Sequence, residues 1–195
     1  MEITHKGNTL KIIRGIYNFN SVKEDTALTI GSFDGVHLGH QMVLNDLKAA
    51  ASKRGLKSAV MIFEPQPQEY FSGEKAPARL MRLRDKLKTF CDSGIDIVVC
   101  LRFDDSLRNL TADAFISIII NGLYAKHLII GDDFRFGCDR SGDFKMLQNS
   151  GKLNNFTVQQ MRTFDLDDKR VSSTSIRKAL VESKFDLAAK LLGKP

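Results

Sequence analysis

Two histidines in a glycine-punctuated turn are the residues best suited to do chemistry. Residues 28–30 are an apolar run short enough for a buried strand, the run breaks at Gly31, and a helical pattern begins near His37. In a strand–turn–helix arrangement, backbone N–H groups and the positive end of the helix dipole face an anion. His37 and His40 lie three residues apart, so they share one helix face and converge on the turn. The pattern predicts a phosphate held by two imidazoles, with satisfied core histidines as the alternative.

A second candidate phosphate site lies near the C-terminus. The hydroxyl residues Ser172, Ser173 and Thr174 precede a helix expected at residues 176–181. Arg177 then falls in the first turn, where its positive charge is unfavourable against the helix dipole. A bound anion explains that placement, and the alternative is an ordinary Ser/Thr cap beside a surface arginine.

Two such helix starts suit a triphosphate attacked at its α-phosphate. The chain has neither the GxxxxGK[ST] nor the GxGxxG pattern. Catalysis would then consist of positioning and charge stabilisation, with His37 and His40 donating hydrogen bonds to phosphate oxygens and Arg177 holding the β- and γ-phosphates. Mg²⁺ prefers waters and substrate phosphates, so we expect no all-protein metal site. No spacing supports a serine–histidine–acid arrangement.

Composition limits the classes of protein to which the chain can belong. Its 195 residues are 43% hydrophobic and 27% charged, which indicates a globular domain. No apolar run is long enough to span a bilayer, no secretory signal is expected, and three cysteines without CxxC spacing fit a reducing cytoplasm. The net charge of +6 fits a solvated basic surface or small phosphorylated ligands, and no dense basic tract indicates nucleic acid.

Strands and helices alternate along the chain, which predicts an α/β fold with a doubly wound parallel five-stranded sheet. Residues 1–10 read as a mobile N-terminal extension, residues 11–15 as a candidate edge strand and residues 16–27 as a loop, before a single domain that runs to residue 195. The expected strands are 27–33, 58–63, 95–101, 127–130 and 156–163, and the expected helices are 37–53, 80–92, 111–123 (capped by Thr111), 144–149, 176–181 and 185–192.

Three loops should meet at the carboxyl edge of this sheet, where ligands bind in such folds. They are the turn at 33–40, the proline-rich segment at 64–67 and the glycine-punctuated loop at 131–137. The segment from residue 64 to 79 reads as a long loop. The basic side chains of helix 80–92 read as a solvated face; they are Arg82, Arg84, Lys86 and Lys88.

The residues of the turn also resemble a known family. Gly31-x-Phe33-Asp34-Gly35-x-His37-x-Gly39-His40 resembles the HxGH signature of the Rossmann-like nucleotidyltransferases, and residues 172–177 resemble their second phosphate motif. The segments FEPQP (63–67), PARL (77–80), GDDFRFG (131–137) and LLG (191–193) are similar to those of the adenylyltransferase module of the bacterial bifunctional riboflavin kinase/FMN adenylyltransferases, the FAD synthetases. The resemblance covers residues 11–195.

This resemblance implies that FMN and ATP, with Mg²⁺ carried by the ATP phosphates, give FAD and pyrophosphate. It implies His37, His40 and Arg177 as catalytic residues. The implied ATP-binding residues are Gly31, Phe33, Asp34, Gly35, His37, His40, Gly131, Asp132, Ser173, Thr174 and Arg177. The implied flavin-binding residues are Pro65, Pro67, Asp133, Phe134, Arg135 and Phe136, with a loop-anchoring core role as the alternative for the two phenylalanines.

Two departures from the family pattern bear on function. Gln66 stands where many relatives have histidine, and the sequence ends at the point after the LLG segment where we expect the β-barrel riboflavin kinase module of the full-length family proteins. We therefore expect adenylyl transfer without kinase activity. The alternatives are another HxGH nucleotidyltransferase, or a non-catalytic nucleotide- or nucleic-acid-binding module of the same fold.

Overall fold

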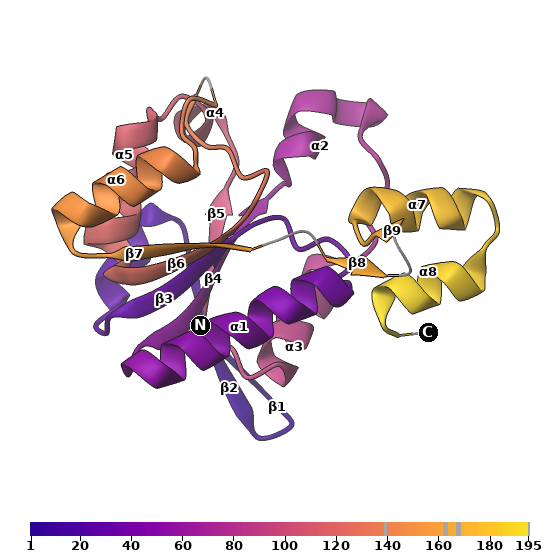
Figure 1. The fold of residues 1–195 in the computed structure, drawn as a ribbon, viewed down its shortest axis with the longest axis horizontal. Coiled ribbons are helices and arrows are strands. Elements are labelled where there is room, and N and C mark those ends of the chain that lie inside the picture. Colours follow the sequence, from indigo (N-terminus) through magenta and orange to yellow (C-terminus); the bar gives the residue numbers. More distant parts are fainter. Residues whose placement is uncertain (139, 162–163, 167–168, 195) are drawn as a thin grey trace.

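A computed structural model of the chain describes residues 1–138, 140–161, 164–166 and 169–194. It contains a seven-stranded sheet with the strand order β1-β2-β5-β4-β3-β6-β7 (Figure 1). Every neighbouring pair in this sheet is parallel except β1 and β2. The strands are β1 (Glu2–His5), β2 (Asn8–Arg14), β3 (Thr26–Ile30), β4 (Lys57–Glu64), β5 (Ile97–Arg102), β6 (Ala125–Gly131) and β7 (Thr157–Met161).

Helices cover both faces of the sheet, as the doubly wound prediction requires (Figure 1). One face packs on α1 (Leu38–Arg54) and α3 (Leu83–Asp92) through a cluster that includes Val60, Leu47 and Phe90. The other face packs on α5 (Ala112–Ser117), a π-helical turn (Ile118–Gly122) and α6 (Phe144–Asn154), through a cluster that includes Met61 and Phe115. Neighbours in β4 therefore point to opposite layers, which explains why the central strands are apolar throughout.

The connections place the carboxyl ends of β3 and β6 at a topological switch point. From β3 the chain moves through α1 to β4 and through α3 to β5, and then returns past β3 to β6. Helix α1 follows β3 on one face and α6 follows β6 on the other, so the loops after these two strands diverge. Ligands bind in such a crevice.

A small C-terminal unit lies beside the sheet (Figure 1). Helices α7 (Ser173–Val181) and α8 (Phe185–Leu192) pack on each other around Ile176, Ala188 and Leu191, next to the hairpin β8 (Asp165–Leu166) and β9 (Lys169–Arg170). The Gln41 side chain of α1 donates to the carbonyl of Leu192 at 3.0 Å and ties this unit to the main domain.

The prediction of a mobile extension at residues 1–10 is wrong. These residues form β1 and the start of β2, and Leu10 is fully buried. The hairpin turns at Lys6 and Gly7, both of which have positive φ angles. A two-residue turn of this kind, with glycine at its second position, is a hairpin signal that the polar composition of the segment obscured. The expected strand at residues 11–15 exists as β2, but it is not an edge strand, because β1 pairs with it on one side and β5 on the other; β1 and β2 raise the strand count from five to seven.

Several expected boundaries also move. Helix 80–92 begins only at Leu83, the expected helix at 111–123 divides into α5 and the π-helical turn, α6 extends to Asn154, and α7 begins at Ser173. The segments expected as loops contain a 3-10 helix (Ile16–Ser21), α2 (Pro67–Ser72), a second 3-10 helix (Gly73–Lys75) and α4 (Asp105–Arg108). Residues 162 and 163 of the last expected strand lie outside the described residues. In the described part of the chain, no helix combines the length and apolarity needed to cross a bilayer.

Candidate active site

The turn between β3 and α1 has an unusual backbone. Phe33, Gly35 and Val36 have φ angles of 48°, 83° and 42°, a region that costs a residue with a side chain about 1–3 kcal/mol. Packing holds the two larger residues in place: Phe33 makes an edge contact with Phe90, and Val36 is fully buried. A Cβ at Gly35 would lie 3.2 Å from Leu80 and Leu192 side-chain atoms. The turn is therefore a rigid element.

The two histidines stack at the start of α1. Their ring centroids lie 3.7 Å apart with an interplanar angle of 19°, and His40 also packs on the ring of Phe33. His37 is the N-cap residue of α1, and its Nδ1 accepts from the backbone N–H of His40 at 3.4 Å. Gly39 lies against this pair, because a Cβ there would lie only 3.3 Å from His37 Nδ1. The sequence-based prediction that the histidines converge is confirmed.

Both imidazoles are neutral at physiological pH. Burial lowers the pKa of His37 to about 4, against the opposing effect of Asp34. Burial, and then the charges of His37 and Lys86, lower the pKa of His40. Since His37 Nδ1 accepts a hydrogen bond, its proton is assigned to Nε2, which leaves an N–H donor on the other side of the ring. The buried Nδ1 of His40 has no hydrogen-bond partner among the described residues.

Asp34 joins the two predicted phosphate-binding helix starts. Its buried carboxylate accepts from the backbone N–H groups of Leu80 and Met81 and pairs with Arg177. Ser173 Oγ donates to the Asp34 carbonyl at 2.9 Å, and Thr174 beside it is exposed. The predicted proximity of the two helix starts is confirmed, across 143 residues of sequence.

The interpretation that placed Arg177 in a first helical turn is wrong. Ser172 caps α7, which begins at Ser173, so Arg177 occupies the fifth helical position. Its guanidinium pairs with Asp34 and also donates to the carbonyl of Ala78 at 2.8 Å. The repulsion between the Arg177 charge and the helix dipole, which suggested a bound anion, is therefore weaker than expected. The carboxylate of Asp34 also balances part of the arginine's charge.

Residues 76–82, which we call the strap, run between the turn and α2. At one end Leu80 and Met81 bind Asp34; beside them Arg79 pairs with Glu64 at the end of β4 and with Glu69 in α2. Glu69 and Gln66 form a capping box at the start of α2. The side-chain Oε2 of Glu64 and Nε2 of Gln66 are buried, and neither atom has a hydrogen-bond partner in the part of the chain that the structure describes.

Lys86 corrects another prediction. Arg82, Arg84 and Lys88 are exposed as expected of a solvated face, but Lys86 is only 1% exposed. Its Nζ donates to the Ser32 carbonyl at 2.6 Å, inside the turn. The signal for this was present in the sequence, since residue 86 lies three positions after Leu83 and four before Phe90, on the apolar stripe of the helix.

The loop after β6 lies at the same sheet edge as the turn. Gly131 ends the strand, and Asp132 and Asp133 follow, with Arg170 at 3.7 Å and 3.4 Å from their carboxylates. Register pairs Thr29 with Ile129, so the ends of β3 and β6 are neighbours. This places Gly131 and Asp132 near the turn, as the parallel sheet predicted.

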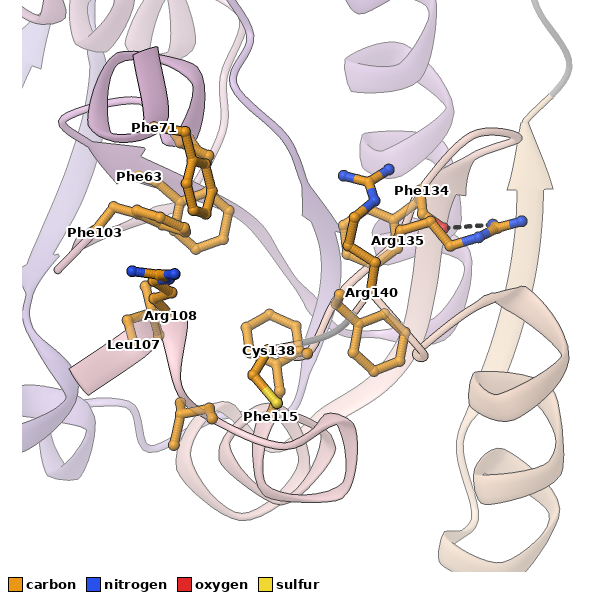
Figure 2. A pocket seen from close by; sticks show the side chains of 14 residues that line it. Phe63, Phe71, Phe103, Leu107, Arg108, Phe115, Phe134, Arg135, Cys138 and Arg140 are labelled. Carbon is orange, nitrogen blue, oxygen red and sulfur yellow. Dashed lines mark hydrogen bonds between the residues drawn. The ribbon is translucent and has the colours of Figure 1, made fainter. Parts of the chain in front are cut away.

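An aromatic cavity of about 520 Å³ opens between this loop and the segment after β4 (Figure 2). Of the residues expected on the flavin side, Pro67, Phe134, Arg135 and Phe136 line it, and Pro65 and Asp133 do not. Phe136 is buried and packs on Phe115, so it also has the core role held as an alternative. The other lining residues are Phe63, Phe71, Phe103, Leu107, Arg108, Leu110, Phe115, Gly137, Cys138 and Arg140.

One wall of the cavity is formed by residues that were not predicted from the sequence. Phe71 in α2 and Phe103 after β5 have ring centroids 5.6 Å apart, and the Arg108 guanidinium lies 5.6 Å from the Phe71 centroid (Figure 2). Phe71 follows Pro67 by four residues, which is the spacing of one helical turn, but the segment was read as a loop. The helix start signal, proline after a capping residue, could have revealed it.

Comparison with known proteins agrees with this geometry. Residues 19–175 match the family model of FAD synthetase. The chain is 50% identical over 187 residues to a bifunctional riboflavin kinase/FMN adenylyltransferase of Haemophilus influenzae, and 48% and 47% identical to those of Pseudomonas fluorescens and Escherichia coli. Each match covers 95% of this chain and 60–61% of the relative, so the chain spans about three fifths of their length.

A solved structure shares the fold. A structure described as a macrolide-efflux protein from Streptococcus pneumoniae superposes with a TM-score of 0.80 and 25% identity, covering 95% of this chain and 62% of that one. The family match extends over the β3 turn, the strap and the loop after β6, and stops inside α7. With the stacked histidines, the Asp34–Arg177 junction and the aromatic cavity all within or adjoining the matched segment, the chain belongs to the FAD synthetase family.

Proposed function

We propose that this chain transfers the adenylyl group of ATP to FMN, giving FAD and pyrophosphate. One observation carries the proposal: an aromatic cavity of about 520 Å³ lies at the same sheet edge as two joined helix starts. The cavity volume falls within the usual range for small-molecule sites, and its phenylalanines offer stacking faces for a planar heteroaromatic ring. The relatives' names, which state FMN adenylyl transfer, support the same assignment.

In this proposal the flavin ring enters the cavity and its phosphate points toward the turn. A phosphate oxygen of FMN attacks the α-phosphorus of ATP, a P–O bond forms, and the bond to the bridging oxygen breaks to release pyrophosphate. His37 and His40, neutral and N–H bearing, donate to phosphate oxygens as charge develops there. Because the FMN phosphate itself attacks the α-phosphorus, the step needs no enzyme nucleophile and no covalent enzyme intermediate.

Arg177, Ser173 and Thr174 bind the outer phosphates. The Arg177 guanidinium has five N–H donors, of which the structure assigns some to Asp34 and Ala78, so the group is pre-oriented and retains donors for a phosphate. Gly131 and Asp132 are proposed to lie beside the nucleotide ribose, and Gly31, Phe33, Asp34 and Gly35 to shape the turn that receives the phosphates. Asp34 acts through Arg177 and the strap, since its carboxylate is fully engaged.

Mg²⁺ is proposed to arrive with ATP. Among the described residues, no three His, Cys, Asp or Glu side chains come together as a metal-binding group. The protein residues therefore do not fit a preformed metal site, and we derive no step from the ion.

The relatives also carry a riboflavin kinase activity by name, and this chain matches three fifths of their length. We propose that the described domain performs adenylyl transfer without phosphorylating riboflavin. The test mixes the chain with Mg²⁺, ATP and either FMN or riboflavin, and separates the flavins by chromatography. FAD from FMN with no FMN from riboflavin is the expected result, and absence of FAD with FMN and ATP contradicts the proposal.

A further inference from the structure

The buried lysine of α3 is outside every role described so far. Lys86 is 1% exposed, while Arg84 and Lys88 on the same helix are exposed. Its Nζ donates to the Ser32 carbonyl, one residue before the positive φ angle of Phe33. The side chain thus crosses from the helix layer to the turn that begins α1.

Stability alone does not account for a lysine at this position. Transfer of an ammonium group from water to a protein interior costs several kcal/mol, and a well-packed apolar residue is commonly as stable or more stable. The neighbours of Lys86 on the helix stripe are Leu83, Leu87 and Phe90, which shows that the layer accepts apolar side chains here. The charge or the hydrogen bond must therefore contribute something other than packing.

The surroundings of the ammonium indicate what this contribution is. The carboxylates of Asp34 in the turn and Glu64 in β4 oppose the effect of burial on the pKa of Lys86. Arg79 and Glu69 have smaller effects on the same ammonium, and Lys86 in turn acts electrostatically on His40 in α1. The ammonium is therefore buried at the Ser32 carbonyl, within electrostatic range of the paired imidazoles.

The hydrogen bond acts on the strained part of the turn. The strap amides hold Asp34 from one side, and Lys86 holds the Ser32 carbonyl from the other. Phe33 lies between the two attachments, Ser32 and Asp34, and Val36 lies between Asp34 and the start of α1; both have left-handed backbone conformations. Removing one attachment allows the turn to relax toward a less costly backbone and shifts the N–H groups that face the phosphates.

We propose that Lys86 is a positioning residue for the triphosphate: it fixes the Ser32 carbonyl of the turn and supplies a buried positive charge behind the phosphate-binding face. The inference rests on the proposed function and names a further residue that serves it. Lys86 acts through the turn and through the electrostatic potential, without touching the substrate.

The test compares Lys86→Met with Lys88→Met, which removes the same charge from an exposed position of the same helix. MgATP affinity is measured by calorimetry, FMN affinity by flavin fluorescence, and kcat and KM by FAD formation. We expect Lys86→Met to weaken MgATP binding and to lower kcat/KM for ATP, each by about tenfold or more, with FMN affinity within about twofold of the Lys88→Met value. A merely structural role would weaken both ligands together and would lower the melting temperature in proportion.

Two further variants separate charge from folding. Lys86→Arg keeps the charge, and Lys86→Gln keeps only a neutral hydrogen-bond donor. We expect Lys86→Arg to retain more MgATP affinity than Lys86→Gln. If Lys86→Met does not fold, the comparison of these two variants tests the positioning role of Lys86. The inference would be overturned if Lys86→Met and Lys88→Met bound MgATP with equal affinity. It would also be overturned if Lys86→Arg and Lys86→Gln bound MgATP equally well. A wild-type chain that binds MgATP without making FAD overturns the proposed function instead, and the affinity ratios still decide the role of Lys86.

Discussion

The histidine pair shows how burial selects a chemical role at the scale of single residues. An imidazolium would bind phosphate through charge, but burial holds both side chains in the neutral form. A neutral imidazole is a directional donor whose tautomer is set by its second nitrogen, and His37 has that nitrogen engaged by the backbone of His40. In the proposed mechanism the pair therefore provides preorganised N–H groups, and Arg177 and Lys86 provide the positive charge.

Removing either imidazole should mainly affect turnover. We expect His37→Ala and His40→Ala to lower kcat by about 10²–10³-fold each, the scale of one lost oxyanion donor. His37→Ala should also destabilise the fold by about 0.5–2 kcal/mol because it removes the N-cap of α1. His37→Asn is the matched control, since asparagine caps helices well but lacks the imidazole. Stopped assays of FAD formation and urea denaturation measure the two effects, and wild-type turnover in both alanine variants would refute the assignment.

The features of single residues were the easiest to predict from the sequence. Spacing alone placed both histidines on one face of a helix start. Ser172 has the capping role that was the alternative for the hydroxyl cluster, and Ser173 and Thr174 lie inside α7. The sequence could not reveal that Asp34 is the partner of Arg177, because the pairing depends on how α7 docks 143 residues away. Lys86 was misread because charge was given more weight than its position on the apolar stripe.

At the scale of elements, the strap determines how the turn and α7 stay together. Asp34 accepts two strap N–H groups and pairs with Arg177 while almost fully buried. Loss of one partner of a buried ion pair costs about 3–5 kcal/mol, because the other charge remains without compensation. The sequence predicted a loop to residue 79 and a helix from residue 80 here, and the strap that the structure shows has no periodicity of its own.

Asp34→Ala should therefore unfold at lower denaturant than a surface control. We expect a loss of about 3–5 kcal/mol in the free energy of unfolding, measured by urea denaturation, with weaker MgATP binding as Arg177 loses its orientation. Asp25→Ala, at an exposed position just before β3, is the control and should stay within about 0.5 kcal/mol of wild type. Equal stability of the two variants would mean that the junction contributes nothing to folding.

Helix α2 should contribute to flavin binding through one exposed ring. Phe71 lines the cavity and is 61% exposed, so its ring is accessible to a bound molecule. We expect Phe71→Ala to weaken FMN binding about tenfold, the scale of one lost aromatic contact, and to leave MgATP affinity unchanged.

Phe185→Ala is the matched control for that experiment. Phe185 is 65% exposed on α8 and does not line the cavity, so its removal should leave FMN affinity unchanged. Flavin fluorescence titration measures both variants. Equal FMN affinities for the two would remove α2 from the flavin site.

At the scale of the whole molecule, the buried histidines connect stability to pH. Burial lowers the pKa values of His37, His40 and His127 below the ordinary value of 6.5. Below pH 6.5 the unfolded chain takes up protons that the folded chain refuses, so stability falls as the pH falls toward the folded pKa values. The same sign applies to the lowered pKa of Glu69, whose contribution to stability is lost in more acidic solution, below its ordinary pKa of 4.5.

We expect the free energy of unfolding to decrease between pH 7 and pH 4, by about 3 kcal/mol for His37 alone. Urea denaturation at pH 7, 6 and 5 measures this slope. His37→Asn keeps the helix cap and removes the titrating group, so its slope should be smaller than that of wild type. A wild-type stability that is flat over this range would contradict the assignment of neutral histidines.

The arrangement of layers was predictable, and the edges of the sheet were not. Continuous apolar runs gave β3, β4, β5 and β6 because strands covered on both faces have no polar side to interrupt the pattern. The β1–β2 hairpin mixes polar residues with the buried Leu10, Ile12 and Ile13, so its sequence shows neither a continuous apolar run nor a clean alternation. The cavity wall from α2 was missed for a related reason, since a six-residue helix shows less than two turns of pattern.

The contacts of the strap also determine which segments of this protein can be exchanged with those of a relative. The same short segment holds the turn through Asp34 and α7 through the Ala78 carbonyl, while Arg79 reaches the end of β4 and α2. Exchanging α2 alone between relatives would separate Glu69 from the arginine that matches it, and exchanging the turn alone would separate Asp34 from its amides. In recombination, residues 34–86 are thus inherited most safely as one block, and a library intended to alter flavin selectivity should place its crossovers outside that block.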